Sequence, residues 1–290
     1  MSNSSNEVKK VSEESESMSN QKEIMIRYNG FNILLGNMKD FMQFSNNRAA
    51  FSEVFMAGYY NPLLGRIMEG DTIIDAGANI GMFTIRAAKK VGQKGNVIAI
   101  EPNPDNLKFL RQNIEINGIH SVRVIDKALY SENDTTINFE GTGVGGHITE
   151  KGGSFSVSTI SLEKVVSEFC ERNYWIKMDI EGGEEYIFDT GQDLSYLQFC
   201  KGIAYEVHSM RGLTLLNNRL ASLGLNPSRI YYENDFIYNI WKGFLSHPKV
   251  FVSLYRGRLL SFARRVSERK DKTMNTNKDF EPGMQYAWRQ

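Results

Sequence analysis

The pattern of apolar and polar positions changes its period between residues 72 and 91. Residues 72–74 are a short apolar run with β-branched side chains, which is typical of a buried strand. The apolar residues that follow recur as on one face of a helix: Ile80, Phe83, Thr84, Ala87, Ala88 and Val91. Gly77 and Gly81 separate the two patterns and predict a tight turn. In an open α/β sheet, such a turn lies at the edge where backbone N–H groups bind ligands.

The same order of strand and helix recurs along the chain and predicts an α/β fold with a mostly parallel sheet. Residues 96–100 form a second apolar strand, and a helix begins at Pro104, with Asn103 as its cap, and ends at Gly118. Further strands are predicted at residues 121–125, 135–139, 174–180 and 202–208, and further helices at residues 162–169 and 214–223. Residues 229–233 and 236–241 are predicted to pair as an antiparallel hairpin that closes the sheet.

Composition and pattern divide the chain into four segments. Residues 1–22 are rich in Ser, Asn, Glu and Lys and are predicted to be a disordered tail. Residues 23–69 contain a β-hairpin with an Asn-Gly turn, followed by a helical extension. Residues 70–245 form the core domain. Residues 246–290 contain a basic amphipathic helix and a disordered C-terminal tail.

Three features outside the central pattern have two interpretations each. A helical segment carries the aromatic residues Phe51, Phe55, Tyr59 and Tyr60, and packing against the sheet is favoured over shaping a pocket. The basic helix after Phe251 is interpreted as docked on the domain, with contact to a membrane surface or a partner as the alternative. The glycine-dense residues 141–153 are assigned to substrate access, with an inert surface loop as the alternative.

Composition narrows the class of function. The 290 residues contain 34 Lys and Arg and 34 Asp and Glu, so a general nucleic-acid binder is not expected. Cys170 and Cys200 are too few and too far apart for a disulfide framework or a zinc cluster. No apolar run is long enough to span a membrane, and no signal peptide opens the sequence. We therefore expect a cytoplasmic enzyme, and the sequence leaves its oligomeric state open.

Acidic residues end the first two predicted strands. Asp75 precedes a turn that lacks the G-x-G-x-x-G spacing of dinucleotide-binding folds. An acid there would repel a phosphate, but it suits the ammonium and sulfonium groups of S-adenosylmethionine. Glu101 follows Gly81 by twenty residues and can accept hydrogen bonds from both ribose hydroxyls. The alternatives are a turn without a ligand and a nicotinamide-dependent oxidoreductase, which would need tighter glycine spacing.

Three blocks of the chain, residues 74–81, 97–104 and 176–184, resemble the FkbM-type S-adenosylmethionine-dependent methyltransferases. The likeness extends over about residues 70–208, and residues 183–189 are less aliphatic than is usual in the family. It implies a Rossmann-like class I methyltransferase fold: a seven-stranded sheet with helices on both faces and an antiparallel closing hairpin. It also implies methyl transfer that is usually to oxygen, with no fixed substrate. The donor site that it implies comprises Asp75, Gly77, Asn79, Gly81, Glu101 and Asn103, with Asp126 as acceptor for the adenine amino group.

Candidate catalytic residues follow the fourth and fifth core strands. Alternation puts Lys177, Asp179 and Glu181 on one face of a buried strand, where a cation beside two carboxylates is costly without a purpose. A structural ion network is the alternative. His208 ends the next strand and is the best single proton acceptor, with Asp179 and Glu181 as the other candidates and Lys177 orienting a carboxylate. No further metal ligands are evident around Asp179 and Glu181, so we expect no metal.

These features predict an enzyme that uses S-adenosylmethionine to methylate a hydroxyl on a small molecule, a sugar or glycan, or a lipid-linked acceptor. Because the transfer is an in-line displacement, the protein must hold donor and acceptor in place and manage one proton. A non-catalytic scaffold is the remaining alternative, and the acids at Asp75, Glu101 and Asp179 count against it because scaffolding does not require them. Neither a nucleic-acid partner nor a membrane span is expected.

Overall fold

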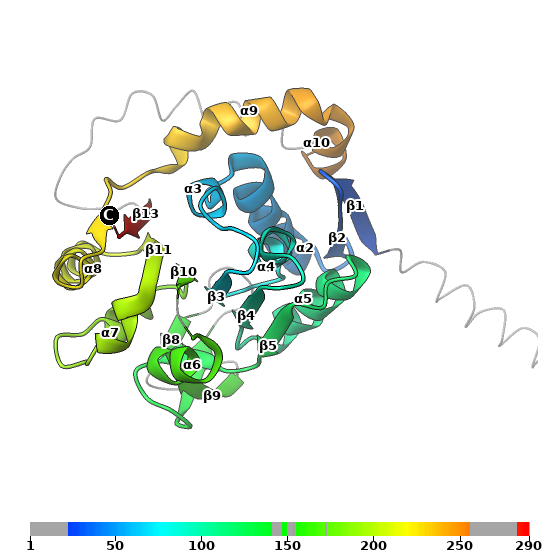
Figure 1. Ribbon diagram of the computed structural model, residues 1–290. Coiled ribbons are helices and arrows are strands. Elements are labelled where there is room, and N and C mark those ends of the chain that lie inside the picture. The colour runs from blue at the N-terminus through cyan, green and yellow to red at the C-terminus, as the bar shows by residue number, and fades with distance from the viewer. Residues whose placement is uncertain are drawn as a thin grey trace, which may run out of the picture.

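The structure is a computed structural model that describes residues 23–140, 147–149, 153, 155–171, 173–255 and 283–289. A seven-stranded sheet forms its centre (Figure 1). In spatial order the strands are β12 (Asn226–Pro227), β13 (Gly283–Trp288), β11 (Cys200–Val207), β10 (Tyr174–Met178), β3 (Thr72–Ala76), β4 (Asn96–Ile100) and β5 (Val122–Ile125). Strand β13 is antiparallel to both neighbours, and the other pairs are parallel. This confirms the predicted fold class.

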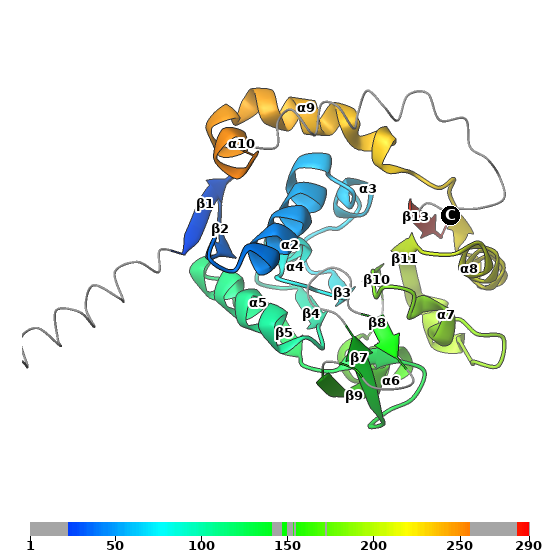
Figure 2. The same ribbon diagram turned by 180° about the vertical axis from the view of Figure 1, so that it is seen from behind.

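Helices cover both faces of the sheet and form two hydrophobic cores (Figures 1 and 2). One face is covered by α4 (Met82–Val91) and α5 (Pro104–Ile116), and the other by α6 (Leu162–Phe169) and α8 (Met210–Ser222). The central strands are buried on both sides, which explains why they read as continuous apolar runs. In register, Lys177 of β10 lies beside Asp75 of β3, so two of the predicted site residues are neighbours across the sheet.

The N-terminal segment packs against the sheet domain rather than standing apart from it. The predicted hairpin is present as β1 (Ile24–Tyr28) and β2 (Phe31–Gly36), and Asn29 and Gly30 both have positive φ, as a type I′ turn requires. Asn113 of α5 accepts from the backbone N–H of Leu34 at 2.7 Å and ties the hairpin to the domain. The chain continues through α2 (Phe41–Phe51), a π-helix (Ser52–Ala57) and α3 (Asn61–Leu64).

The chain forms a second, smaller sheet between strands β5 and β10 in sequence. Its strand order is β6 (Ala128–Tyr130), β9 (Phe155–Ser161), β7 (Thr136–Glu140) and β8 (His147–Thr149). The strand predicted at residues 135–139 is therefore present, but it pairs in this sheet and not in the central one. Most of the glycine-dense loop predicted at residues 141–153 lies outside the described residues.

The antiparallel end of the central sheet is built from different residues than the sequence predicts. Residues 236–241 are not a strand: a 3₁₀ turn (Glu233–Phe236) leads into α9 (Ile237–Ser246), which packs across the π-helix. Asn239 donates to the Ala57 carbonyl at 2.9 Å from this helix. The antiparallel strand is Gly283–Trp288, part of the tail that was predicted to be disordered. The predicted basic helix begins within α10 (Pro248–Tyr255), and its remainder lies outside the described residues.

The correction at the C-terminus has a physical reason. In β13 the residues from Gly283 to Ala287 are all buried, including the polar Gln285. Tyr205 donates to the Gln285 side chain at 2.8 Å, and Gln285 donates to the Ser228 carbonyl at 2.6 Å, so its burial carries no unsatisfied amide. A strand of six residues with a polar residue at its centre shows no clear alternation of apolar and polar positions. Its sequence therefore does not distinguish it from a polar tail.

Candidate functional site

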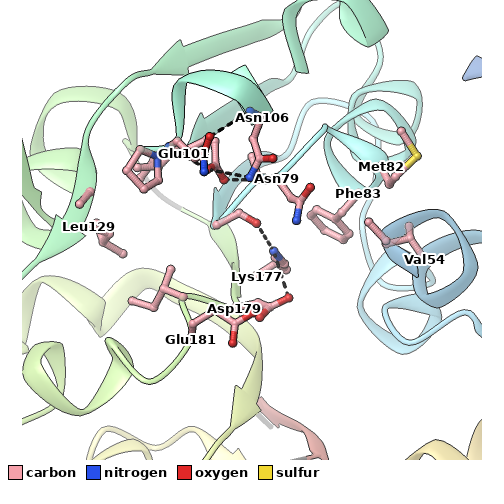
Figure 3. Close-up of a pocket in the computed structure, with 18 of the residues that line it drawn as sticks. Val54, Asn79, Met82, Phe83, Glu101, Asn106, Leu129, Lys177, Asp179 and Glu181 are labelled. Atoms are coloured by element: carbon pink, nitrogen blue, oxygen red, sulfur yellow. Dashed lines mark hydrogen bonds and ion pairs between the residues drawn. The ribbon is translucent and has the colours of Figure 1, made fainter. Parts of the chain in front are cut away.

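A cavity of about 100 Å³ opens where the carboxyl ends of β3, β4 and β10 meet (Figure 3). Its wall includes Lys177 of β10 and, from the turns after the three strands, Gly77, Asn79, Glu101 and Asp179. The other walls come from the N-terminal helices, from the start of α4 and from the small sheet. Residues that were singled out in three separate sequence blocks therefore surround one cavity, as carboxyl ends of parallel strands in one sheet allow.

The glycine turn after β3 is shaped by its neighbours in the fold. Gly77 has φ +74°, and a Cβ there would lie 1.8 Å from the backbone carbonyl oxygen of Asp179. Gly81 has φ +87°, and a Cβ there would lie 2.7 Å from Leu110. Asn79 also has a positive φ and accepts from the Ile80 N–H through its own side chain. Glycine is thus required at position 77 by the close approach of the chain after β10.

Glu101 joins the turns that follow β3 and β4. Its carboxylate accepts from the backbone N–H groups of Asn79 at 2.8 Å and Asn103 at 2.9 Å, and from the Asn106 side chain at 3.2 Å. Burial raises the pKa of Glu101, and these three donors oppose that rise. Asn103 caps α5 by accepting from the N–H of Asp105 at 2.8 Å. Asn106 had not been singled out in the sequence.

Asp126 follows the carboxyl end of β5, as the sequence predicts, but it lies outside the cavity wall. Its side chain is 70% exposed and faces Arg111 at 3.8 Å, and it is not part of the cavity wall. Strand β5 is the edge strand of the central sheet, and the chain turns from it into β6. As a result Ala128 and Leu129, two and three residues further on, line the cavity in place of Asp126. The contact of Asp126 with adenine stays a prediction.

Asp75 and Lys177 form a buried ion pair beneath the cavity. Asp75 is fully buried, accepts from the Thr84 hydroxyl at 2.5 Å and lies 3.4 Å from the Lys177 ammonium. Lys177 also donates to the Gly77 carbonyl at 2.6 Å. Burial lowers the pKa of Lys177, but the carboxylates of Asp75 and Asp179 raise it more, so the ammonium stays charged. Asp75 therefore holds Lys177, which in turn holds the glycine turn after β3. Asp75 does not itself form part of the cavity wall.

Four carboxyl groups and one imidazole gather at the end of β10 and β11. The imidazole Nε2 of His208 lies 3.5 Å from a Glu181 oxygen and 3.6 Å from a Glu206 oxygen. Its Nδ1 lies 3.9 Å from Glu184, the first residue of α7 (Glu184–Ile187). Asp179 lies 3.7 Å from Lys177 on the other side of the group. The structure thus brings the four predicted catalytic residues together.

The protonation states of this group follow from burial and mutual repulsion. Burial and the neighbouring Asp179 carboxylate raise the pKa of Glu206 far above its usual value, which favours a neutral Glu206 hydrogen-bonded to Asp179. Burial also raises the pKa of Asp179, but the Lys177 ammonium and its hydrogen bonds lower it more. For His208, burial lowers the pKa, and the Glu181, Glu184 and Asp179 carboxylates raise it above its usual value.

The same group contains the atoms that could hold a metal ion. One ligand atom each of Asp179, Glu206 and His208 lies within 4.8 Å of the others. The expectation of no metal rested on finding only Asp179 and Glu181 in the sequence, and the fold supplies Glu206 and His208 beside them. The Asp179 carboxylate, however, already accepts from Tyr60 at 2.8 Å and shares a proton with Glu206.

Four residues of the site have no role predicted from sequence: Tyr60, Asn106, Glu184 and Glu206. Glu206 precedes His208 by two residues, so the alternation of side chains along a strand puts both on one face. Tyr60 belonged to the aromatic cluster for which packing was favoured. It is buried as that interpretation requires, yet its hydroxyl reaches Asp179.

The sheet order, the glycine turn and the acid at the end of β4 define a class I S-adenosylmethionine-dependent methyltransferase. The chain matches the Methyltransferase FkbM domain over residues 75–239, more than half of its length, and it belongs to this family. S-adenosylmethionine is therefore its methyl donor. In the part of the chain that the structure describes, no helix has both the length and the apolar character needed to cross a membrane.

Shorter and more distant similarities accompany this match. The probable cobalt-precorrin-6B C(15)-methyltransferase (decarboxylating) of Sulfurisphaera tokodaii is 34% identical over 61 residues, 21% of this chain and 32% of that protein. The chain thus spans about a third of the length of this curated relative. The solved O-methyltransferase of Thermotoga maritima is 12% identical with a TM-score of 0.41, covering 95% of this chain and 80% of that one. Fibrillarin of Aeropyrum pernix, solved with S-adenosylmethionine, is 12% identical with a TM-score of 0.40, covering 92% of this chain and 83% of that one.

Glu101→Ala should weaken S-adenosylmethionine binding by about 1.5–3 kcal/mol, because hydrogen bonds to a charged group are lost. Isothermal titration calorimetry on the folded variant measures this directly. Glu115→Ala, on the exposed side of α5, is the matched control and should bind normally. Unchanged affinity in Glu101→Ala would remove Glu101 from the donor site.

Proposed function

We propose that the protein transfers a methyl group from S-adenosylmethionine to a hydroxyl on a small molecule, a sugar or glycan, or a lipid-linked acceptor. The observation that carries this proposal is that Asp179 and Glu181 line the donor cavity, and that the His208 imidazole lies behind them, 3.5 Å from a Glu181 oxygen. A hydroxyl must lose its proton as the new bond forms, and these groups offer proton acceptors on the acceptor side.

The cavity wall suits the donor. When bound, S-adenosylmethionine supplies an electrophilic methyl group on a cationic sulfonium. Glu101 is placed to accept from hydroxyls of its nucleoside part, with Asn79 and Asn103 fixing the carboxylate. Lys177 fixes the Gly77 carbonyl and so the shape of the turn. The Asp179 and Glu181 carboxylates give the wall a negative potential that favours a cationic ligand.

The proton-accepting step is assigned to His208 with Asp179 as its partner in the site. In its neutral form the imidazole can take the acceptor's proton, and the imidazolium is then stabilised by Glu181, which lies 3.5 Å from Nε2. Glu206 is neutral and holds Asp179 by a hydrogen bond, so Asp179 remains a fixed carboxylate that can orient the acceptor hydroxyl. Holding the acceptor in this way is most of what an in-line displacement requires.

The lining of the cavity supports an uncharged acceptor. On the side of the N-terminal helices and α4 it is formed by Val54, Met82 and Phe83, together with the carboxylate of Glu53. Lys177 is the one cation among the described residues of the wall, and its charge is balanced by Asp75 and Asp179. A phosphate-rich acceptor such as a nucleic acid would meet carboxylates here and be repelled. A cytoplasmic location stays a prediction.

The test is to incubate the protein with methyl-labelled S-adenosylmethionine and with small-molecule, glycan and lipid extracts of its host. We expect the label in a methyl ether formed at a former hydroxyl, and this methyl ether should survive mild hydrolysis of the purified fraction. Glu101→Ala should lose most of the labelling at low donor concentration, and Glu115→Ala should retain it. Label on nitrogen or carbon, or in nucleic acid alone, would contradict the proposal.

Chelation tests the alternative in which a cation replaces the proton acceptor. We expect the labelling rate to be unchanged after EDTA treatment and gel filtration. The Asp179 carboxylate already has partners in Tyr60, Lys177 and Glu206, so it does not need a metal ion. Loss of rate that Mg²⁺ or Mn²⁺ restores would assign Asp179, Glu206 and His208 to a metal centre.

A further inference from the structure

One wall of the cavity is built by a segment outside the family domain. The matched domain covers residues 75–239, whereas residues 41–64 form α2, the π-helix and α3. Ala50, Glu53, Val54 and Tyr60 of this segment line the cavity. Figure 3 shows Val54 beside Phe83 at the edge of the site. The π-helix is a local departure from regular helix of the kind that often occurs at functional sites.

Tyr60 connects this segment to the reacting groups. Its hydroxyl donates to Asp179 Oδ2 at 2.8 Å, across 119 positions of sequence. The side chain is buried, and its ring meets Phe83 edge-on at 5.2 Å between centroids. The Lys177 ammonium lies 5.5 Å from the same ring. Contacts on the ring and at the hydroxyl leave Tyr60 one orientation, so its hydrogen bond holds Asp179 against rotation.

The backbone around Tyr60 is fixed as well. Arg86 of α4 donates to the Val54 carbonyl and, at 2.8 Å, to the Asn61 side chain, one on each side of Tyr60 in sequence. Tyr286 of β13 donates to the Tyr59 carbonyl. The segment is therefore anchored to a core helix and to a central strand, and Tyr60 lies between the anchors.

We propose that Tyr60 is a positioning residue for methyl transfer, and that residues 41–64 complete the active site by fixing the Asp179 carboxylate toward the acceptor. This inference rests on the proposed function for its catalytic consequence. Its physical basis, the hydrogen bond from Tyr60 to Asp179, can be tested without an acceptor.

The charge of Asp179 reports on this bond. The groups that act on it come from several elements: Lys177 of β10, Glu206 of β11, His208 after β11, Glu184 of α7 and Asp75 of β3. Tyr60 donates to the charged form of Asp179 and so favours it. Removing the hydroxyl while keeping the ring takes away one stabilising donor and leaves all of the other groups in place.

The experiment compares Tyr60→Phe with the unchanged protein by ¹³C NMR of labelled aspartate carboxyls during a pH titration. The Asp179 signal is assigned by its loss in Asp179→Asn. We expect the Asp179 pKa to rise by about one unit, a tenfold change in its protonation equilibrium. Tyr174→Phe is the matched control: it removes another buried tyrosine hydroxyl, bonded to the Tyr196 carbonyl at 2.8 Å and remote from the cavity. The control should leave the Asp179 pKa unchanged.

Two further measurements separate positioning from general damage. Calorimetric affinity of Tyr60→Phe for S-adenosylmethionine should stay within about threefold of normal, and methyl labelling of the extract should fall about tenfold or more. An unchanged Asp179 pKa, or labelling equal to that of Tyr174→Phe, would overturn the inference. If no extract is labelled by any variant, the proposed function fails, while the NMR result still decides whether Tyr60 holds Asp179.

Discussion

Deleting residues 283–290 is expected to leave a chain that does not fold cooperatively. These residues supply β13, which lies between β11 and β12 in the central sheet. Met284, Tyr286 and Ala287 are buried in it, and burial of each large apolar side chain is worth roughly 1.5–3 kcal/mol. Without β13, the long strand β11 would also expose its backbone as a new edge.

Arg289 adds polar contacts that the deletion would also remove. Its guanidinium donates to the carbonyl oxygens of Cys200, Leu223 and Leu197 at 2.7, 2.7 and 2.8 Å. These carbonyls lie at the start of β11, after α8 and before β11, so one side chain ties three segments together. Added to the lost burial, the expected cost is a large part of the roughly 5–15 kcal/mol that stabilises a typical domain.

Urea denaturation, monitored by circular dichroism, measures the unfolding transition and so tests this prediction. Deletion of residues 1–22, predicted to be a disordered tail, is the control and should leave the transition midpoint unchanged. A cooperative transition with a normal midpoint after deletion of residues 283–290 would show that β13 is dispensable. That result would restore the interpretation of the tail as an appendage.

The contrast between β13 and the turn after β3 shows what sequence could predict. The turn is local: an apolar strand, Gly77 and Gly81, and a helical stripe lie within twenty residues, and each pattern implies its neighbour. Strand β13 pairs with β11, about eighty residues earlier, and its central Gln285 interrupts the apolar run. Nothing close in sequence indicates that pairing, so a short polar-centred strand looked like a tail.

The site divides in the same way. Residues at the carboxyl ends of strands, such as Glu101, Lys177 and Asp179, could be assigned because parallel strands deliver them to one edge. Asp126 follows an edge strand and lies outside the cavity wall, which the strand pattern does not reveal, and its contact with adenine stays a prediction. Tyr60 could not be assigned because its contact with Asp179 depends on how an N-terminal helix packs across the finished domain.

The structural role of a residue can also differ from the role that the sequence suggests. Gly77 was assigned to the donor site, whereas a side chain there would first meet the Asp179 carbonyl. Asp75 was expected to face the donor, whereas it is buried against Lys177 and Thr84. Both residues still serve the cavity, because both fix the chain segments that form its wall.

The rate of methyl transfer is expected to rise with pH and to level off above the pKa of His208. The base must be neutral to accept the acceptor's proton, so protonation at low pH abolishes the rate. Burial lowers the pKa of His208, but the surrounding carboxylates of Glu181, Glu184 and Asp179 raise it more. The inflection should therefore lie above the ordinary histidine value of about 6.5.

His208→Ala should remove this inflection and lower the rate by on the order of 10²–10⁴, while calorimetric affinity for S-adenosylmethionine stays close to normal. His120→Ala, which changes an exposed histidine after α5, is the matched control and should keep the profile. Asp179→Asn should also lower the rate strongly, because it removes the charge that Lys177, Tyr60 and Glu206 hold in place. If Asp179 alone were the base, His208→Ala would keep most of the rate. Two folded variants that bind donor and transfer methyl at normal rates would place the reacting groups elsewhere in the cavity wall.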